Sequence, residues 1–87
     1  MTHLTLLTKA DCSLCDQAKT TLEKVRHDYQ LAVEVIGLES PQGQELAARS
    51  GMAFPPAVFV DGQPFSYGRL SERKLRRTLD RIIASNA

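Results

Sequence analysis

The chain divides into strands and helices because its apolar positions repeat with two different periods. His3–Thr8 alternates and then runs apolar, which predicts a central strand buried on both faces. From residue 13 to about residue 29, apolar side chains recur at helical spacing with charged residues between them, which predicts the first helix. The alternating, β-branched segment Leu31–Ile36 completes a strand–helix–strand unit, whose crossover favours parallel pairing. We therefore expect the second strand beside the first.

Turn and cap residues organise the middle of the chain. Ser40 and Pro41 suit the N-cap and first turn of a short helix, and Gly51 suits its end. Gly43 lies inside this segment, so we expect it to weaken the helix.

The last third of the chain contains a hairpin signal followed by one more helical pattern. Ala57–Val60 is a short apolar strand, Asp61-Gly62 is a strong two-residue turn, and residues 63–66 should return antiparallel. Ser71 can cap a final helix, whose apolar stripe consists of Leu75, Leu79, Ile82 and Ile83. The predicted order of elements is β-α-β-α-β-β-α.

Length and charge limit the possible classes of protein. A chain of 87 residues with 43% hydrophobic content fits a single domain over residues 1–87 with one modest core. The net charge of +1 offers no global attraction for nucleic acid or a membrane surface, and no segment approaches the length of a membrane span. The N-terminal residues lack the basic leader and apolar core of an export signal, so we expect a cytoplasmic location.

A local excess of positive charge lies near the C-terminus. Only Glu72 and Asp80 oppose six basic residues, which are Arg69, Arg73, Lys74, Arg76, Arg77 and Arg81. We interpret this cluster as the solvated side of the last helix, with a docking surface for an acidic partner as the alternative.

Both cysteines of the chain stand in one C-x-x-C unit, Cys12-Ser13-Leu14-Cys15, between the first strand and the first helix. Two thiols at this spacing in a first helical turn can form a disulfide with little backbone motion, and a helix N-terminus favours a thiolate. In a reducing cytosol such a pair is more often catalytic or metal-bound than structural. A redox dithiol is our main interpretation. The alternative is half of a four-thiolate metal or iron–sulfur site, completed by dimerisation or by external thiols.

The cysteine unit and two other features resemble the thioredoxin superfamily, in particular its short glutaredoxin-like branch. Thr8–Cys15 looks like the glutaredoxin active-site segment, including a lysine three residues before the first cysteine, and Pro56–Gly62 is similar to the family's cis-proline segment and β-hairpin. The resemblance covers nearly the whole chain. It implies a thioredoxin-like α/β fold with a four-stranded mixed sheet flanked by three helices, and an enzyme that acts as a dithiol–disulfide oxidoreductase.

The resemblance assigns roles to the residues around the dithiol. Cys12 is the expected nucleophile because it stands nearer the helix end, and Cys15 is expected to resolve the mixed disulfide. Lys9 either stabilises the thiolate by its charge or is a solvated residue at the strand end. Ser13 and Leu14 replace the Pro-Tyr pair common in glutaredoxins, which leaves the redox potential open.

Further candidate substrate-binding residues lie in the proline segment and after the hairpin. Pro56 is the expected cis-proline, with a stiff trans loop as the alternative. In this superfamily the preceding residue helps to hold a peptide or glutathione, but here Pro55 has no N–H to donate. Gly68 and Arg69 occupy the segment where glutathione-binding glutaredoxins carry a Gly-Gly pair followed by acidic residues, and no acid stands at that place.

These departures predict poor use of glutathione. We expect no tightly bound cofactor, and either glutathione or a thioredoxin-reductase-type system as the reductant. The expected partners are that reductant and a disulfide-containing protein or small molecule, without nucleic acid or membrane, and the chain is expected to be a monomer. A redox-inactive binding module on the same frame is a third alternative. Phe65 and Tyr67 are assigned equally to a groove beside the dithiol and to the core.

Overall fold

The computed structural model describes residues 1–52 and 54–86 and confirms the predicted order of elements. The sheet has the strand order β2-β1-β3-β4. Its strands are β1 (Thr2–Thr8), β2 (Leu31–Gly37), β3 (Ala57–Val60) and β4 (Gln63–Tyr67). The helices are α1 (Ser13–Arg26), α2 (Pro41–Ser50) and α3 (Glu72–Asn86). Because β1 pairs in parallel with β2 and antiparallel with β3, the mixed sheet and the central place of β1 are as predicted.

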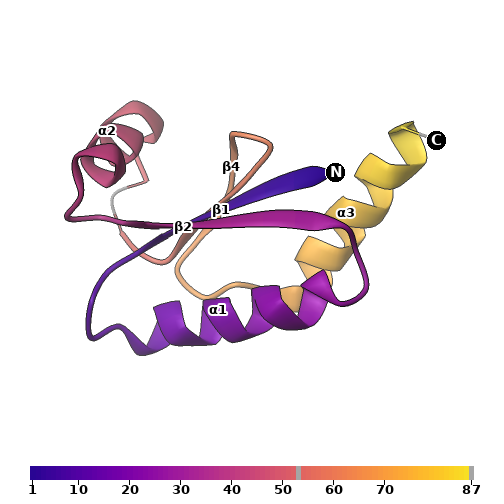
Figure 1. Cartoon of the computed structure of the whole chain (residues 1–87), viewed down its shortest axis with the longest axis horizontal. Helices are drawn as coiled ribbons and strands as arrows, with labels where there is room; N and C mark the ends of the chain where they lie inside the picture. The colour runs from indigo at the N-terminus through magenta and orange to yellow at the C-terminus, as the bar shows by residue number, and fades with distance from the viewer. Residues whose placement is uncertain (53, 87) are drawn as a thin grey trace.

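Helices cover both faces of the sheet, which gives three layers (Figure 1). α1 and α3 pack on one face, where the larger core consists of Leu4, Leu6, Ala18, Leu22, Val25, Leu31, Val58, Val60, Leu70, Leu75 and Leu79. α2 covers the other face, over a smaller core made of Leu7, Ile36, Ala47, Ala57 and Phe59. The two-residue period of a strand therefore sends the neighbours Leu6 and Leu7 to opposite cores.

Gly43 is the point where α2 touches the turn that follows β2. A Cβ atom at this position would overlap the carbonyl oxygen of Gly37 and would lie 2.9 Å from Leu38 Cα. The Ser40 hydroxyl ties the turn to the helix, since it donates to the Gly37 carbonyl (2.7 Å) and accepts the Gly43 N–H (2.9 Å). Ser40 thus caps the helix as predicted, and Gly51 ends it in a left-handed conformation with φ of 75°. The prediction that Gly43 weakens α2 missed its role, because a glycine is what permits this close approach.

The boundary of α1 differs from the prediction, since the helix ends at Arg26 and not near Tyr29. Tyr29 leaves the helix so that its ring packs against the larger core. Its hydroxyl donates a 2.6 Å hydrogen bond to Asp80 Oδ1 on α3. This contact with a residue far along the chain sets where the helix stops.

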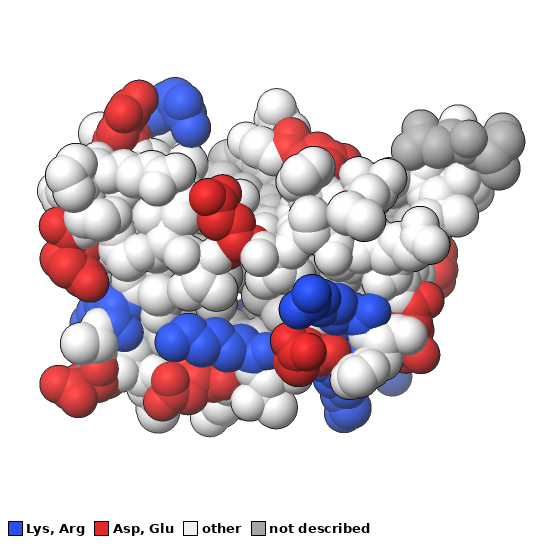
Figure 2. All heavy atoms as spheres, in the orientation of Figure 1, with Lys and Arg blue, Asp and Glu red and all other residues white. Residues whose placement is uncertain are grey.

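Arg76 joins α3 to the end of α1. Its guanidinium donates to Asp28 Oδ2 (2.8 Å) and to Glu72 Oε2 (2.9 Å), and it lies 5.9 Å from the centre of the Tyr29 ring. The hydrogen bond from Arg76 lowers the pKa of Glu72, which also pairs with Lys24 (3.4 Å). Basic and acidic side chains accordingly lie next to each other along this part of the surface (Figure 2). Arg76 is therefore an exception to the solvated cluster predicted for α3.

We expect the free energy of unfolding of the wild type to fall more steeply above about pH 10 than that of a Tyr29→Phe variant. The hydrogen bond to Asp80, with smaller effects of desolvation and of the Asp80 charge, raises the pKa of Tyr29 above its usual value of 10.0. A pKa raised by folding means that the folded state favours the neutral hydroxyl. The contribution of this hydrogen bond to the free energy of unfolding is therefore present below pH 10.0, and it is lost as the pH rises through the raised pKa.

Urea unfolding at about pH 8 and about pH 11 measures this difference. An Asp80→Asn variant keeps the tyrosine but removes the carboxylate, so it should lose the same contribution. Parallel pH dependence in the wild type and both variants would show that the hydrogen bond does not couple to stability.

Candidate active site

One end of the sheet brings together segments that are distant in the sequence. Because β1 and β3 are antiparallel, the end of β1 at Thr8 lies beside the start of β3 at Ala57. β4 returns to the same end, where Tyr67 pairs with Ala57 and the Gly68 N–H donates to the Pro56 carbonyl (2.8 Å). The loop from β1 into α1 and the first turn of this helix carry the two cysteines at this end (Figure 1). The topology thus collects the cysteine loop, the proline segment and the residues after the hairpin.

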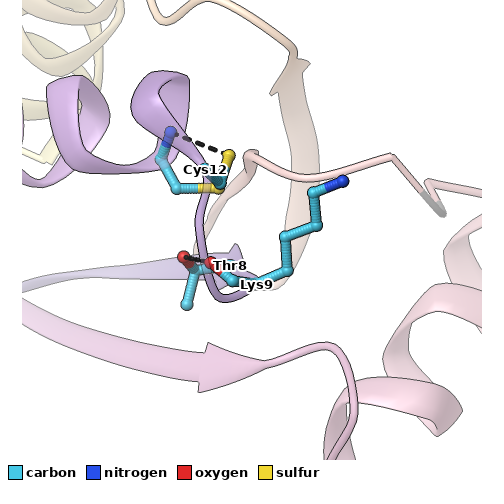
Figure 3. Close-up of a disulfide and its surroundings, with 4 residues drawn as sticks. Thr8, Lys9 and Cys12 are labelled. Carbon is cyan, nitrogen blue, oxygen red and sulfur yellow. Dashed lines mark hydrogen bonds between the residues drawn. A yellow bond between two sulfur atoms is a disulfide. The ribbon is translucent and has the colours of Figure 1, made fainter.

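Cys12 and Cys15 form a disulfide at the N-terminus of α1, with their Cα atoms 5.2 Å apart (Figure 3). Cys12 is the N-cap residue and Cys15 lies in the first turn. The Cys15 N–H donates to Cys12 Sγ at 3.1 Å, so a sulfur atom satisfies a donor that the helix itself leaves unpaired. Such a donor and the positive end of a helix dipole generally favour a thiolate at the cap position.

The two sulfur-bearing residues differ in their exposure. Cys15 is completely buried and shares the core-facing side of α1 with Ala18, whereas Cys12 is only partly buried. Between them, Ser13 is exposed and Leu14 is partly buried. A large substrate can therefore reach Cys12 but not Cys15.

The charged side chains nearest to the dithiol in the sequence are exposed. Lys9 extends from the end of β1, and Figure 3 shows its ammonium group to one side of the disulfide and not against it. Asp11 has φ of 53°, in the left-handed region that aspartate tolerates, so it is a turn residue. Asp16 lies in the first turn of α1, where a carboxylate interacts favourably with the helix dipole. A tuning role for Lys9 stays a prediction.

Pro55 and Pro56 are joined by a cis peptide bond, so the predicted cis-proline is confirmed and the trans alternative is wrong. Pro56 is buried, Pro55 is partly buried, and the preceding Phe54 is 77% exposed. Gly68, which donates to the Pro56 carbonyl, has φ of 76°, a conformation that glycine adopts without steric cost. The structure thus places Pro55, Pro56 and Gly68 together, and their contact with a substrate stays a prediction.

The residues between β4 and α3 are occupied by packing and capping. Leu70 is buried in the larger core, and the Ser71 hydroxyl accepts the Lys74 N–H at 3.2 Å at the start of α3. Arg69, immediately before them, is exposed. Neither Leu70 nor Ser71 is therefore free to take the place of the acidic residues that are missing here.

Two polar residues near this end were missed by the sequence analysis. Thr8 is buried, and its carbonyl accepts the Leu38 N–H at 2.7 Å. The Ser66 hydroxyl is buried with no hydrogen-bond partner among the described residues. A hydroxyl residue directly after a large apolar residue of a strand, Leu7 or Phe65, is the signal that could have identified both. The two aromatic residues of β4 differ in their surroundings, since Phe65 packs against the core and Tyr67 is 67% exposed.

The described residues contain no group of three or more His, Cys, Asp or Glu side chains placed to hold a metal ion. A metal site on this dithiol would need ligands from a second chain or from external thiols. Over the same residues, none of the helices combines the length and apolar content needed to cross a bilayer.

A family model described as Glutaredoxin-like domain (DUF836) matches residues 3–80. The chain belongs to the glutaredoxin-like domain family. Among solved structures, a mutant thioredoxin from Halobacterium salinarum NRC-1 is similar to this glutaredoxin-like chain, with a TM-score of 0.73 and 20% sequence identity. The match covers 91% of this chain and 72% of that thioredoxin, and at this identity it shows a thioredoxin-like fold. No curated protein matches the chain.

The glutaredoxin-like family match includes every element of the site, since residues 3–80 contain both cysteines, the cis-proline and the start of α3. The family, the thioredoxin-like fold and the disulfide at the start of α1 together support a thiol–disulfide oxidoreductase-like function in general terms.

Proposed function

We propose that this glutaredoxin-like protein reduces protein or small-molecule disulfides, with Cys12 as the attacking thiol and Cys15 as the resolving thiol. The observation that carries the proposal is the unequal exposure of a bonded pair. Cys12 is partly exposed at the cap of α1, and Cys15 is fully buried in the first turn. Cys12 can approach a bulky disulfide, and Cys15 lies close enough to displace the product afterwards.

The first half-reaction starts from the Cys12 thiolate, which the Cys15 N–H and the dipole of α1 stabilise. Its sulfur attacks one sulfur of the substrate disulfide. A mixed disulfide forms between Cys12 and that sulfur, and the other substrate sulfur leaves as a thiolate that takes a proton from water.

In the second half-reaction, Cys15 gives its proton to water and attacks Cys12 Sγ. The Cys12–Cys15 disulfide forms, the mixed disulfide breaks, and the second substrate sulfur leaves and is protonated. Two electrons and two protons have then passed from the dithiol to the substrate. An external reductant must return them, and the cycle needs no resident cofactor. A cytoplasmic monomer would obtain this reductant from the systems that keep cytosolic thiols reduced.

Residues at the same end of the sheet would bind the substrate around Cys12. They are exposed or partly exposed next to the cysteine loop, or they shape the backbone beside it. We assign this contact to Lys9, Ser13, Leu14, Pro55, Pro56, Gly68 and Arg69.

One two-stage experiment tests the reaction and its reductant. Reduced protein mixed with a disulfide substrate should lose two thiols per chain, counted by alkylation and mass spectrometry, because both cysteines end in one disulfide. The oxidised protein is then offered either glutathione or thioredoxin reductase with NADPH. We expect glutathione to restore the thiols roughly tenfold more slowly, because Pro55 lacks an N–H and Leu70 and Ser71 are committed to packing and capping.

A Pro55→Val variant is the matched change, since it returns an N–H to the residue before the cis-proline. This variant should narrow the difference between the rates at which glutathione and thioredoxin reductase restore the thiols. Two thiols that persist after the first stage would contradict the proposed reaction. Reduction of the wild type by glutathione as fast as by the reductase would contradict the assignment of the reductant.

A further inference from the structure

A groove of about 430 Å³ runs along the outer side of β4, between Met52 and the start of α3. Its apolar wall is formed by Met52, Phe65 and Tyr67. Arg69, just before α3, and Lys74, in its first turn, supply two positive charges. None of the reaction steps above uses this groove as a whole.

The two cations of the groove differ from Arg76 in their ion pairs. Arg76 is bound to two carboxylates. Arg69 and Lys74 are exposed and form no ion pair with any residue that the structure describes. Next to an apolar wall, such charges fit carboxylates on a partner that also brings an apolar side chain.

The backbone of β4 makes the groove suitable for an extended segment. β4 is an edge strand of the sheet, so one side of its backbone has no neighbouring strand. The Gly68 N–H points toward Pro56, and neighbouring residues in a strand point their backbone groups in opposite directions, so those of Tyr67 point outward. Ser66, whose buried hydroxyl has no partner among the described residues, is also a lining residue of the groove.

The groove leads to the dithiol end of the sheet. Tyr67 lines the groove and pairs with Ala57, the residue after the cis-proline. Gly68 follows Tyr67 and is bonded to Pro56. A chain lying along β4 would therefore be directed toward the end where Cys12 stands.

We propose that the groove along β4 binds an extended, acidic segment of a protein substrate that lies beside the disulfide to be reduced. Its carboxylates would meet Arg69 and Lys74, an apolar side chain would pack on Phe65 and Tyr67, and its backbone would pair with the free edge of β4. The proposal rests on the proposed function and names the substrate class for it. A segment of several residues would match a groove that four consecutive residues of β4, 64–67, line.

Single-turnover rates test the proposal without a recycling system. Pre-reduced protein is mixed with one of two cysteine peptides in disulfide form, identical except that Glu residues beside the cysteine are replaced by Gln. The wild type should reduce the Glu peptide roughly fivefold faster than the Gln peptide, because two exposed charge pairs contribute modestly each. The Arg69→Glu/Lys74→Glu variant should bring this ratio to about one or below. Arg81→Glu, a single charge reversal about 10 Å further along α3 than Lys74, should leave the ratio unchanged.

Equal rates of reduction of the Glu and Gln peptides by the wild type would overturn the proposal. A change in this ratio in Arg81→Glu as large as in the double variant would also overturn it. Glutathione disulfide serves as a further substrate. A double variant that slows only glutathione disulfide would assign the two cations to glutathione and would also overturn it. If the wild type fails to reduce even the uncharged hydroxyethyl disulfide, the proposed function itself is wrong.

Binding can be judged separately from the redox reaction. A Cys12→Ser/Cys15→Ser variant is titrated with a cysteine-free Glu peptide while its backbone amides are followed by NMR. Shifts confined to residues 65–69 and 74, weaker with the Gln peptide, are expected. The absence of shifts at these residues would rule out the groove.

Discussion

Replacing Cys12 with serine should lower the rate of disulfide reduction by at least about a thousandfold, because a hydroxyl does not attack a disulfide at neutral pH. The fold should remain, since serine is a favoured N-cap whose hydroxyl can accept the Cys15 N–H that Cys12 Sγ accepts at 3.1 Å. The measurement is reduction of a protein disulfide by the pre-reduced protein, with circular dichroism as the check on α1. A Cys12→Ser variant as active as the wild type would rule out Cys12 as the attacking thiol.

Replacing Cys15 with serine should preserve the first half-reaction and stop the second. The mixed disulfide on Cys12 should then accumulate to nearly one per chain, visible as a mass adduct under non-reducing conditions. Gln17→Ala is the matched control, since Gln17 is exposed on the same helix outside the site, and its adduct should stay transient. An adduct on Cys15 in the Cys12→Ser variant would reverse the two roles.

Replacing Gly43 with alanine should lower the free energy of unfolding by roughly 3 kcal/mol, the upper part of the range for overpacked sites. Helix propensity alone would give the opposite sign, because alanine is favoured over glycine in a helix by about 1 kcal/mol. The added methyl group, however, would overlap the Gly37 carbonyl oxygen and would lie 2.8 Å from the Gly37 carbonyl carbon. These are backbone atoms, so the turn after β2 must move as a whole. Urea unfolding measures the loss.

Ala48→Gly is the matched control for α2, because Ala48 is exposed on the same helix. It should cost about 1 kcal/mol through propensity alone, which shows how the helix responds when no contact changes. A Gly43→Ala protein more stable than the wild type would mean that the turn yields easily. The expected loss is a large share of the stability of a domain this small, about 5–15 kcal/mol.

The order of the elements could be predicted because its signals are local. Asp61 and Gly62 both adopt positive φ, 49° and 82°, which is what the hairpin signal of this dipeptide predicts. The end of α1 could not be found in this way, because the contact that decides it joins Tyr29 to Asp80, 51 residues away. The close approach at Gly43 also depends on a contact outside the helix, and a propensity scale contains no such contact.

The candidate site was predictable to a similar degree. The spacing of Cys12 and Cys15 and their place before a helix are readable from the sequence, and the cis-proline followed from the family resemblance. The division of Phe65 and Tyr67 between core and surface was not, because it depends on β4 being an edge strand with an irregular register opposite Val58. The alternation of a strand gives two faces, but it does not say which neighbours will cover them.

The junction of α1 and α3 also bears on when the redox site forms during synthesis of the chain. Asp28 and Tyr29, just beyond the dithiol helix, find their partners Arg76 and Asp80 only 48 and 51 residues later. A growing chain that has reached the hairpin already carries both cysteines, yet the apolar face of α1 still lacks the α3 side chains that cover it. The helix that presents the dithiol therefore gains its full apolar packing only when the last helix is in place.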